Sequence, residues 1–243
     1  MEFDPTVFGL GFHHFVELEY QLFGRTLAPA LHIATFVVLA LVFWKGNKVR
    51  LLFTALFTLN WLFLLGYWGV FAVIYWANIG LPYLLAFIAA PVLLVLIAIN
   101  WCRELALKRV DLDFKGTAKM RWAVIAVMLW GFWYPTYVYG QGFVLNFGDL
   151  LFSCYGLMPC PTTMVVLSLF TLNYPKENQT LFNLMTAYAI FIGTATVITG
   201  WMPDIPFILI GLYAFALILA SRIRRSRNAR QTDAKTNMPG IPR

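Results

Sequence analysis

The residues with the clearest chemical potential are five consecutive ones, Pro159, Cys160, Pro161, Thr162 and Thr163. The two prolines remove backbone donors and clash with the preceding turn, so a continuous helix through this point is not expected. One of the threonines can cap a new helix after the break, and its free amides would direct a partial positive charge at the cysteine. Such a position makes a thiol more reactive or attracts an anion. The pattern therefore predicts a binding site at these five residues, or else a structural proline kink with an inert cysteine.

A second set of candidate residues lies near the N-terminus: His13, His14, Glu17 and His32. Imidazole and carboxylate groups together bind Zn or Cu. His13 and Glu17 are one helical turn apart, which would place both on one face of a helix. The other interpretation is that these side chains contact polar headgroups and that His32 hydrogen-bonds between helices. The sequence leaves two alternatives open, a Zn or Cu site or no cofactor at all.

Long apolar runs are the elements that must position these residues. Hydrophobic residues make up 60% of the chain and charged residues 12%, whereas a soluble domain has roughly 25% charged residues. A helix needs about 20 apolar residues to cross the hydrocarbon core. Seven segments without Asp, Glu, Lys or Arg meet or approach that length: Leu27–Trp44, Leu51–Trp76, Pro82–Trp101, Trp122–Tyr139, Leu150–Tyr174, Leu181–Thr199 and Ile205–Ala220. The sequence predicts an all-α integral membrane bundle of seven transmembrane helices, with the fifth span broken at Pro159–Pro161.

The positive charges give this bundle an orientation. All Lys and Arg residues except Arg25 lie in alternate gaps between the runs or in the C-terminal tail. Cytoplasmic loops retain Lys and Arg, so we expect the N-terminus outside, the C-terminus inside and a multi-pass protein of the inner (plasma) membrane. Residues 1–26 form an outer interfacial segment with a short helix at 11–24, and residues 27–220 form the transmembrane domain.

The remaining residues, 221–243, are expected to form a basic disordered cytoplasmic tail that contacts anionic lipid headgroups. The formal charge of +7 is spread over membrane boundaries and this tail. It does not gather on one folded basic face, so no nucleic-acid partner is expected.

Missing residues exclude several classes of membrane protein. Because none of the seven runs contains Asp, Glu, Lys or Arg, we expect no buried carboxylate relay and no voltage sensor. Retinal is excluded because no run contains a lysine for a Schiff base. The familiar hydrolase signatures Gly-x-Ser-x-Gly and His-Glu-x-x-His do not occur either. The sequence therefore does not favour an enzyme.

Three short motifs together resemble a known family. They are the stretch from Gly156 to Thr163, the sequence Leu27-Ala28-Pro29, and the Trp201-x-Pro203-Asp204 segment. The chain resembles an uncharacterised family of small multi-pass bacterial membrane proteins with a Pro-Cys-Pro-Thr-Thr motif. The resemblance covers the chain up to about residue 220. It implies an integral membrane protein and carries no activity with it.

Three interpretations of function remain open on the sequence. The favoured one is a small-solute permease or binding module with an outward-facing cavity near the broken fifth span, because broken helices commonly frame binding sites in transporters. The second is a membrane-embedded redox or metal-handling enzyme or factor that uses Cys160. The third is an assembly or scaffold subunit that packs against another membrane protein or against a second copy of itself.

Overall fold

Helices make up 81% of the structure, a computed structural model that describes residues 5–71, 74, 84–114, 117–138, 141–176 and 178–236. The helical elements described are, in chain order, α1 (Pro5–Glu19), η1 (Tyr20–Gly24), α2 (Leu27–Lys45), η2 (Gly46–Val49), α3 (Arg50–Leu64), η3 (Leu65–Phe71), α5 (Leu84–Leu107), η4 (Lys119–Ala123), α6 (Val124–Trp133), α7 (Asp149–Phe152), α8 (Pro159–Asn173), α9 (Gln179–Ile198), η5 (Met202–Asp204) and α10 (Ile205–Thr236). An antiparallel hairpin of β1 (Thr136–Val138) and β2 (Gly142–Val144) is the only sheet in this part of the chain. The all-α class predicted from composition is confirmed.

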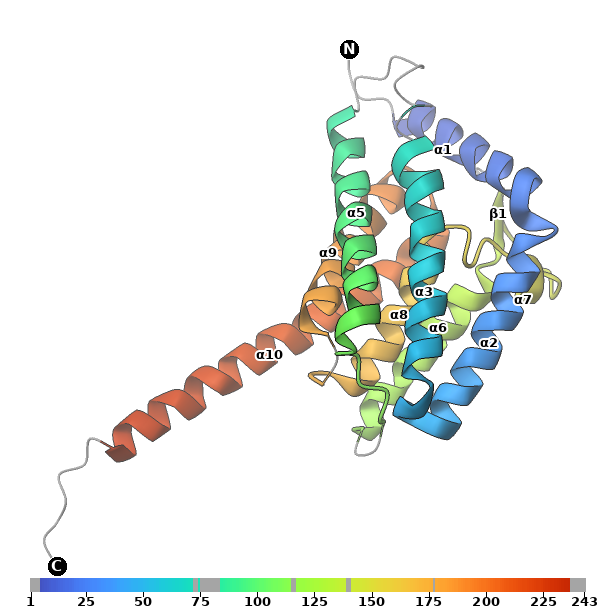
Figure 1. Ribbon diagram of the computed structural model, residues 1–243. Coiled ribbons are helices and arrows are strands. Elements are labelled where there is room, and N and C mark those ends of the chain that lie inside the picture. Colours follow the sequence, from blue (N-terminus) through green and yellow to red (C-terminus); the bar gives the residue numbers. More distant parts are fainter. Residues whose placement is uncertain are drawn as a thin grey trace, which may run out of the picture.

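Four stretches are long and apolar enough to cross a membrane: Leu27–Val70, Ala89–Leu107, Gln179–Ile198 and Met202–Asn228. On length and composition the chain is therefore a membrane protein. The first stretch folds back at η2, where Gly46 has a φ of 55°, so that α2 and α3 lie side by side (Figure 1). Large apolar side chains face away from the bundle on these two helices, among them Phe36 and Leu59, which are 71% and 68% exposed. Such faces suit hydrocarbon surroundings.

Parts of three predicted spans lie outside the described residues, namely 72–73, 75–83 and 139–140. The same applies to residues 1–4 of the predicted outer segment and to residues 237–243 of the predicted tail. The rest of the tail differs from the expectation of disorder, because α10 continues as a helix to Thr236 and extends away from the bundle (Figure 1). The physical reason is that the sequence has no Gly or Pro between Ser221 and Met238 to end the helix, and that Arg, Ala, Gln and Lys favour helix.

Helix α8 is the central helix of the bundle. All 15 of its residues are buried, and it packs against α6, α9 and α10. It begins at Pro159, so both prolines lie in its first turn, where a missing N–H removes no intrahelical hydrogen bond. The one-turn helix α7 and the non-helical segment 153–158 precede it. The break predicted in the fifth span therefore lies just before the prolines, and no helix is interrupted by them.

Gly131 of α6 permits the close approach of α6 to α8. A Cβ atom there would lie 2.9 Å from the carbonyl oxygen of Pro161 and 3.0 Å from Cβ of Met164. We expect Gly131→Ala to lower the free energy of unfolding by about 1–3 kcal/mol, because overpacking forces the two helices apart. Thermal unfolding of the purified protein measures this. Gly66→Ala is the control, since no described atom outside its own helix lies within 4 Å of a Cβ built there. Equal melting temperatures for the two variants would contradict the packing.

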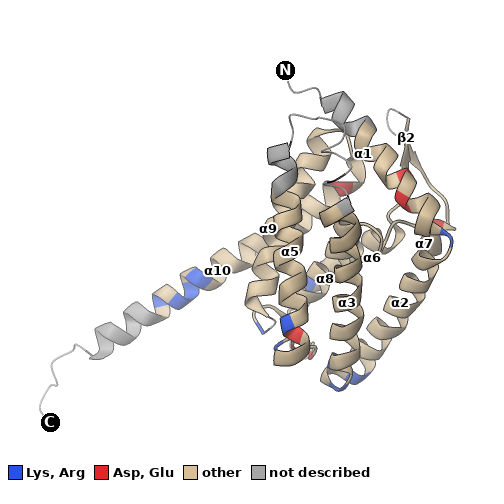
Figure 2. Cartoon of the chain, turned by 45° about the horizontal axis from the view of Figure 1, so that its top comes forward, with Lys and Arg blue, Asp and Glu red and all other residues tan. Residues whose placement is uncertain are grey.

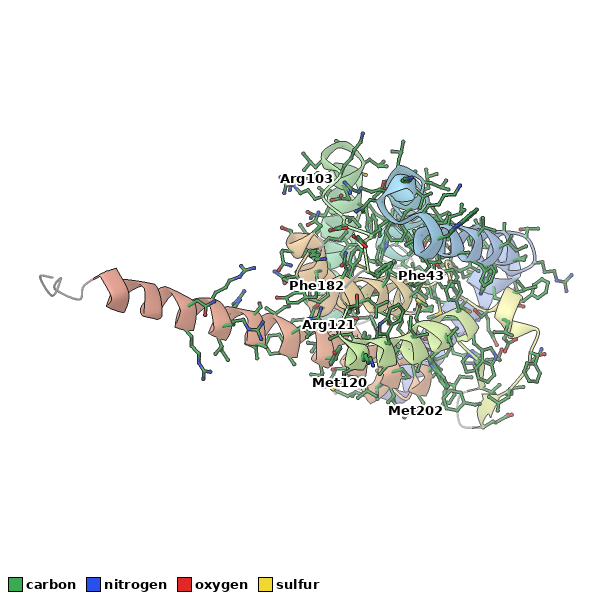
Figure 3. All side chains as sticks on the ribbon, turned by 90° about the horizontal axis from the view of Figure 1, so that it is seen from below. Phe43, Arg103, Met120, Arg121, Phe182 and Met202 are labelled. Atoms are coloured by element: carbon green, nitrogen blue, oxygen red, sulfur yellow. The ribbon has the colours of Figure 1, made fainter. Side chains whose placement is uncertain are left out.

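Charged residues are distributed unevenly along the bundle. Figure 2 shows Lys and Arg at the end where α2 joins α3 and along α10, with acidic residues also at the lower end of α5. Other acidic residues lie near α1 and α7, where a basic residue is also visible. Figure 3 views the bundle from its positive end, with Arg103 and Arg121 labelled. The guanidinium of Arg121 donates to the carbonyl of Tyr174, and Arg50 Nη1 donates to Lys108 O at 2.6 Å. We refer to this end as the basic end.

Helix α1 lies across the opposite end of the bundle, which we refer to as the α1 end (Figure 1). The short helix predicted at 11–24 is present as the second part of α1 together with the π-helix η1. Phe12 and Phe15 of α1 are buried, and their ring centroids lie 5.6 Å and 4.9 Å from that of Trp68 on η3. These ring contacts hold α1 against η3, and they place the polar face of α1 next to the site described below.

Candidate functional site

A cavity of about 460 Å³ opens at the α1 end. Its wall combines aromatic, acidic and polar side chains, among them His13, Glu17, Tyr20, Tyr134, Tyr137, Asn146, Asp149, Ser153, Cys154 and Trp201. They come from α1, η1, the β1–β2 hairpin, α7 and the segment before η5. The volume falls in the usual range for small-molecule sites, about 300–1,000 Å³. The sequence elements that meet here are far apart in the chain.

Asp149 fixes one side of the cavity by joining α7 to the hairpin. Its Oδ2 atom accepts hydrogen bonds from the backbone N–H and the hydroxyl of Thr136, both at 3.1 Å. The side chain is nonetheless part of the cavity wall, and Asp149 is only 7% exposed. Hydrogen bonds to a carboxylate are stronger than those between two neutral groups. The hairpin therefore has a fixed position, and so do Tyr137 and its neighbours on β1.

Tyr134 and Trp201 form the floor of the cavity. Tyr134 ends α6 with a φ of 28°, an uncommon conformation for a residue other than glycine. This conformation turns its side chain inward, where its hydroxyl accepts a hydrogen bond from Trp201 Nε1 at 2.6 Å and donates to Asp204 Oδ1 at 2.7 Å. The floor of the cavity is thus hydrogen-bonded to a carboxylate inside the bundle.

Asp204 is fully buried beneath this floor. Its Oδ2 atom accepts from the Thr196 hydroxyl at 2.6 Å, and the Cys160 thiol also hydrogen-bonds to the carboxyl group. The residues come from α6, α8, α9 and η5, so the carboxyl group joins four elements. Buried charged or polar groups require such partners. We refer to Tyr134, Cys160, Thr196, Trp201 and Asp204 as the Asp204 network.

The buried carboxylates correct an expectation from the sequence. The apolar runs contain no acid, and Asp204 lies just outside the last predicted span, which begins at Ile205. The structure instead turns Asp204 inward on the 3₁₀ turn η5 and leaves it 0% exposed. Glu104, near the basic end, is also 0% exposed and accepts from Val110 N at 2.5 Å and from Asn178 Nδ2 at 2.8 Å. Carboxylates are thus present inside the bundle.

The five residues predicted as the binding site do not line the cavity. Pro159, Pro161, Thr162 and Thr163 are buried, and Cys160 is 3% exposed. Met158 takes the N-cap position without a side-chain cap. The nearby cavity wall comes from Ser153 and Cys154, which precede the prolines.

The two threonines have structural partners instead. Thr162 Oγ1 donates to Met158 O at 2.8 Å and accepts from Gly156 N at 3.1 Å, which stabilises the turn before α8. Thr163 Oγ1 donates to Pro159 O at 2.7 Å, within the first turn of α8. Both hydroxyls therefore have hydrogen-bond partners within the chain.

The four predicted metal-binding residues are divided between two places. His13 Nδ1 lies 3.4 Å from Glu17 Oε1 on α1, and His14 is exposed on the same helix. His32 lies within the bundle, where its Nδ1 donates to Ala28 O at 2.8 Å and its Nε2 lies 3.0 Å from Ser153 Oγ. In the described part of the chain no three His, Cys, Asp or Glu residues are grouped as metal ligands. The Zn or Cu site stays a prediction, with His32 apart from the other three residues.

Glu19 lies behind the cavity wall on α1. Its side chain is 1% exposed, and its Oε1 accepts from Trp68 Nε1 at 2.9 Å. Its Oε2 atom is buried and has no hydrogen-bond partner among the described residues. Burial raises the pKa of the Glu19 carboxyl well above its ordinary value near 4.5, and the Trp68 hydrogen bond offsets part of this rise.

The raised pKa of Glu19 predicts a pH dependence of stability. Between about pH 4.5 and the higher pKa of the folded state, the unfolded chain has lost a proton that the folded chain keeps. The free energy of unfolding therefore falls as the pH rises through this window. Glu19→Gln is neutral throughout and can still accept from Trp68, so we expect it to melt at a higher temperature than the wild type at pH 7 and at the same temperature at pH 4. Parallel melting profiles from pH 4 to pH 8 would contradict this.

No known protein family, curated protein or solved structure matches this chain. What the cavity and the Asp204 network do must therefore be argued from their geometry. The sequence did not single out Tyr134, Tyr137 or Trp201 as site residues. The available signal was indirect, because these aromatic residues lie at or near the ends of apolar runs on the side that lacks Lys and Arg.

Proposed function

We propose that this chain binds a small solute in the cavity at the α1 end and acts as a small-solute permease or binding module of the inner (plasma) membrane. The observation that carries the proposal is the cavity of about 460 Å³ whose floor, Tyr134 and Trp201, is hydrogen-bonded to the buried Asp204. Cavities of this size with a few convergent polar groups are typical of small-molecule sites. A carboxylate within a membrane bundle is a functional group by default, because its burial is unfavourable.

We further propose the predicted topology, seven spans with the α1 end outside and the basic end in the cytoplasm. In support of this proposal, seven helices, α2, α3, α5, α6, α8, α9 and α10, overlap the seven predicted spans in sequence. The Lys and Arg residues at the basic end and on α10 support the orientation (Figure 2). On α10, Arg222, Arg224, Arg225 and Arg227 are exposed, which suits contact with anionic headgroups of the inner leaflet.

The alternative functions have less support. A redox or metal-handling role for Cys160 requires access to its thiol, but Cys160 is 3% exposed and hydrogen-bonded to Asp204. A scaffold role is compatible with the part of α10 that extends beyond the bundle (Figure 1). Co-purification of a stoichiometric partner in mild detergent would favour that role over the permease.

Reconstitution into proteoliposomes tests the proposal. We expect the purified protein to take up at least one compound from a panel of small labelled solutes above the level of protein-free liposomes. Tyr137→Ala removes an aromatic ring from the cavity wall and should lower uptake at least about tenfold, the effect of losing roughly 1.4 kcal/mol of binding energy. Lys48→Ala, at the basic end, is the control.

The outcomes separate the two forms of the proposal. Binding without uptake would support a binding module and contradict a permease. Equal uptake by the wild type and Tyr137→Ala would contradict the assignment of the cavity as the site. Neither binding nor uptake of any solute in the panel would contradict the proposed function.

A further inference from the structure

The cavity at the α1 end carries negative charge. Glu17 of α1 and Asp149 of α7 are both in its wall, and no described Lys or Arg is among the lining residues. Arg25 is exposed and outside the wall, and its charge acts on Tyr20. The basic side chain in the wall is that of His13, whose Nδ1 lies 3.4 Å from Glu17 Oε1. A cavity that has two carboxylates and no Lys or Arg among its described lining residues attracts a positively charged ligand.

A third acid lies directly behind the wall. Cys154 lines the cavity and is within electrostatic reach of both Glu19 and Asp149. Glu19 is 1% exposed, and its Oε2 atom is buried without a hydrogen-bond partner among the described residues. Glu19 of α1 and Asp149 of α7 are therefore both close to Cys154. Neither side chain offers an anion a positive partner in this part of the cavity.

Aromatic rings form much of the rest of the wall. Tyr20, Tyr134, Tyr137 and Trp201 come from four different elements or connections and all line the cavity. The rings of Tyr137 and Trp201 meet edge to face, with centroids 5.6 Å apart, and the His13 ring lies 6.1 Å from that of Trp201. The faces of Trp and Tyr attract cations, and groups of such rings bind quaternary ammonium ions. The wall thus combines two kinds of group that favour the same ligand.

We propose that the ligand of this cavity is a small organic cation, a quaternary ammonium or alkylated amine, held by Glu17 and Asp149 and by the aromatic rings of the wall. The inference rests on the proposed function and adds the substrate class to it. An inorganic cation would leave the aromatic rings without a role. A neutral solute would leave the two carboxylates without one.

The test compares two ligands of nearly the same shape that differ in charge. Choline is a quaternary ammonium, and 3,3-dimethylbutan-1-ol is its neutral isostere with carbon in place of nitrogen. Binding of each to the purified full chain in nanodiscs is measured by isothermal titration calorimetry. We expect choline to bind at least tenfold more tightly than the neutral isostere.

Two variants assign the selectivity to the cavity. Asp149→Asn and Glu17→Gln remove one charge each, and the asparagine can still accept from Thr136. We expect each to weaken choline binding about tenfold or more and to leave the affinity for the neutral isostere within about threefold. Asp113→Asn, near the basic end, removes the same charge from another place and should not change choline binding. Because Glu17 is exposed on α1, we expect its variant to fold, and it remains informative if Asp149→Asn does not fold.

The results distinguish this inference from the proposed function. If the neutral isostere binds as tightly as choline, the inference about charge is wrong but the cavity remains a solute site. If choline binds equally to the wild type, Asp149→Asn and Glu17→Gln, the cation is not held at this site, and the inference is wrong. If neither compound binds, the cation inference is again wrong, and the uptake panel then decides the proposed function separately.

Discussion

Replacing Asp204 by alanine is expected to destabilise the folded protein by about 3–5 kcal/mol, the usual effect of breaking a buried, hydrogen-bonded charge pair or network. The Asp204 carboxyl group has partners on α6, α8 and α9, namely Tyr134, Cys160 and Thr196. Its loss leaves the Tyr134 hydroxyl and the Cys160 thiol without this acceptor. The Thr196 hydroxyl can still donate to the carbonyl oxygen of Ile192 or Gly193. The measurement is the denaturation of purified protein in detergent, followed by temperature or by a chemical denaturant.

A graded series provides the controls for this prediction. Asp204→Asn keeps one acceptor oxygen and should cause a smaller loss than Asp204→Ala. Tyr134→Phe removes a single hydroxyl and should cost about 1 kcal/mol, the usual net value of one hydrogen bond. If Asp204→Ala is as stable as the wild type, Asp204 does not hold these helices together. The account of the cavity floor would then be wrong as well.

Replacing His32 by alanine is the second large expected effect, a loss of about 2–4 kcal/mol. His32 of α2 is 2% exposed, and its Nε2 lies 3.0 Å from Ser153 Oγ and 3.1 Å from Phe132 O. Its ring thereby connects α2 to the end of α6 and to the segment before α8. Truncation removes these hydrogen bonds and leaves a void. Thermal unfolding of the purified variant measures the loss.

The same experiment separates a structural histidine from a metal ligand. His14→Ala is the matched control, because His14 is exposed on α1 and its loss should change stability by about 0.5 kcal/mol or less. A structural role also predicts that a strong metal chelator leaves the melting temperature of the wild type unchanged. A chelator effect that disappears in His32→Ala would contradict the structural role and favour the Zn or Cu site.

Apolar runs and turn residues predicted the helices of this fold well, for a physical reason. A backbone in lipid must satisfy its own hydrogen bonds, so long apolar runs favour helices. The run Trp122–Tyr139 is an exception, because its helix α6 ends at Trp133 and its last part contains strand β1. Helices α2, α3 and α9 begin within a few residues of the predicted spans. The end of α10 was predicted poorly, because a charged composition was interpreted as disorder although no residue there breaks a helix before Pro239. In that segment the helix propensity of the residues favours a helix, whereas their polarity favours disorder.

The sequence predicted the break in the fifth span close to the cavity but not the residues that line the cavity. The break before α8 is real, but Cys160 faces Asp204 and not a cavity, since η5 brings a carboxylate from about 40 residues later in the chain. The cavity wall joins α1, the hairpin and η5, and only tertiary structure brings these segments together. Sequence periodicity reports local structure and cannot show which loops converge. The sequence contains Asp149 and Trp201, but it does not predict that both line the same cavity.

The Asp204 network connects the cavity floor to the middle of the bundle by hydrogen bonds. Trp201 and Tyr134 contact the cavity and also belong to the hydrogen-bonded chain that ends at Asp204 and Thr196. A ligand that moves either ring changes the hydrogen bonds of the buried carboxyl group. For a permease this arrangement links occupancy of the cavity to the packing of α6, α9 and α10. The link is a consequence of the proposed function and stands or falls with it.

The central claim is that the α1 end, with its cavity, faces the outside and the basic end faces the cytoplasm. Sided labelling with a membrane-impermeant maleimide tests it most directly, in a chain whose Cys102, Cys154 and Cys160 are replaced by serine. Phe147→Cys places a thiol on the loop between β2 and α7, where Phe147 is 87% exposed, and Lys48→Cys places one on η2 at the basic end. The account predicts that intact cells label Phe147→Cys at once and Lys48→Cys only after permeabilisation. The reverse pattern, or labelling of both from outside, would contradict it.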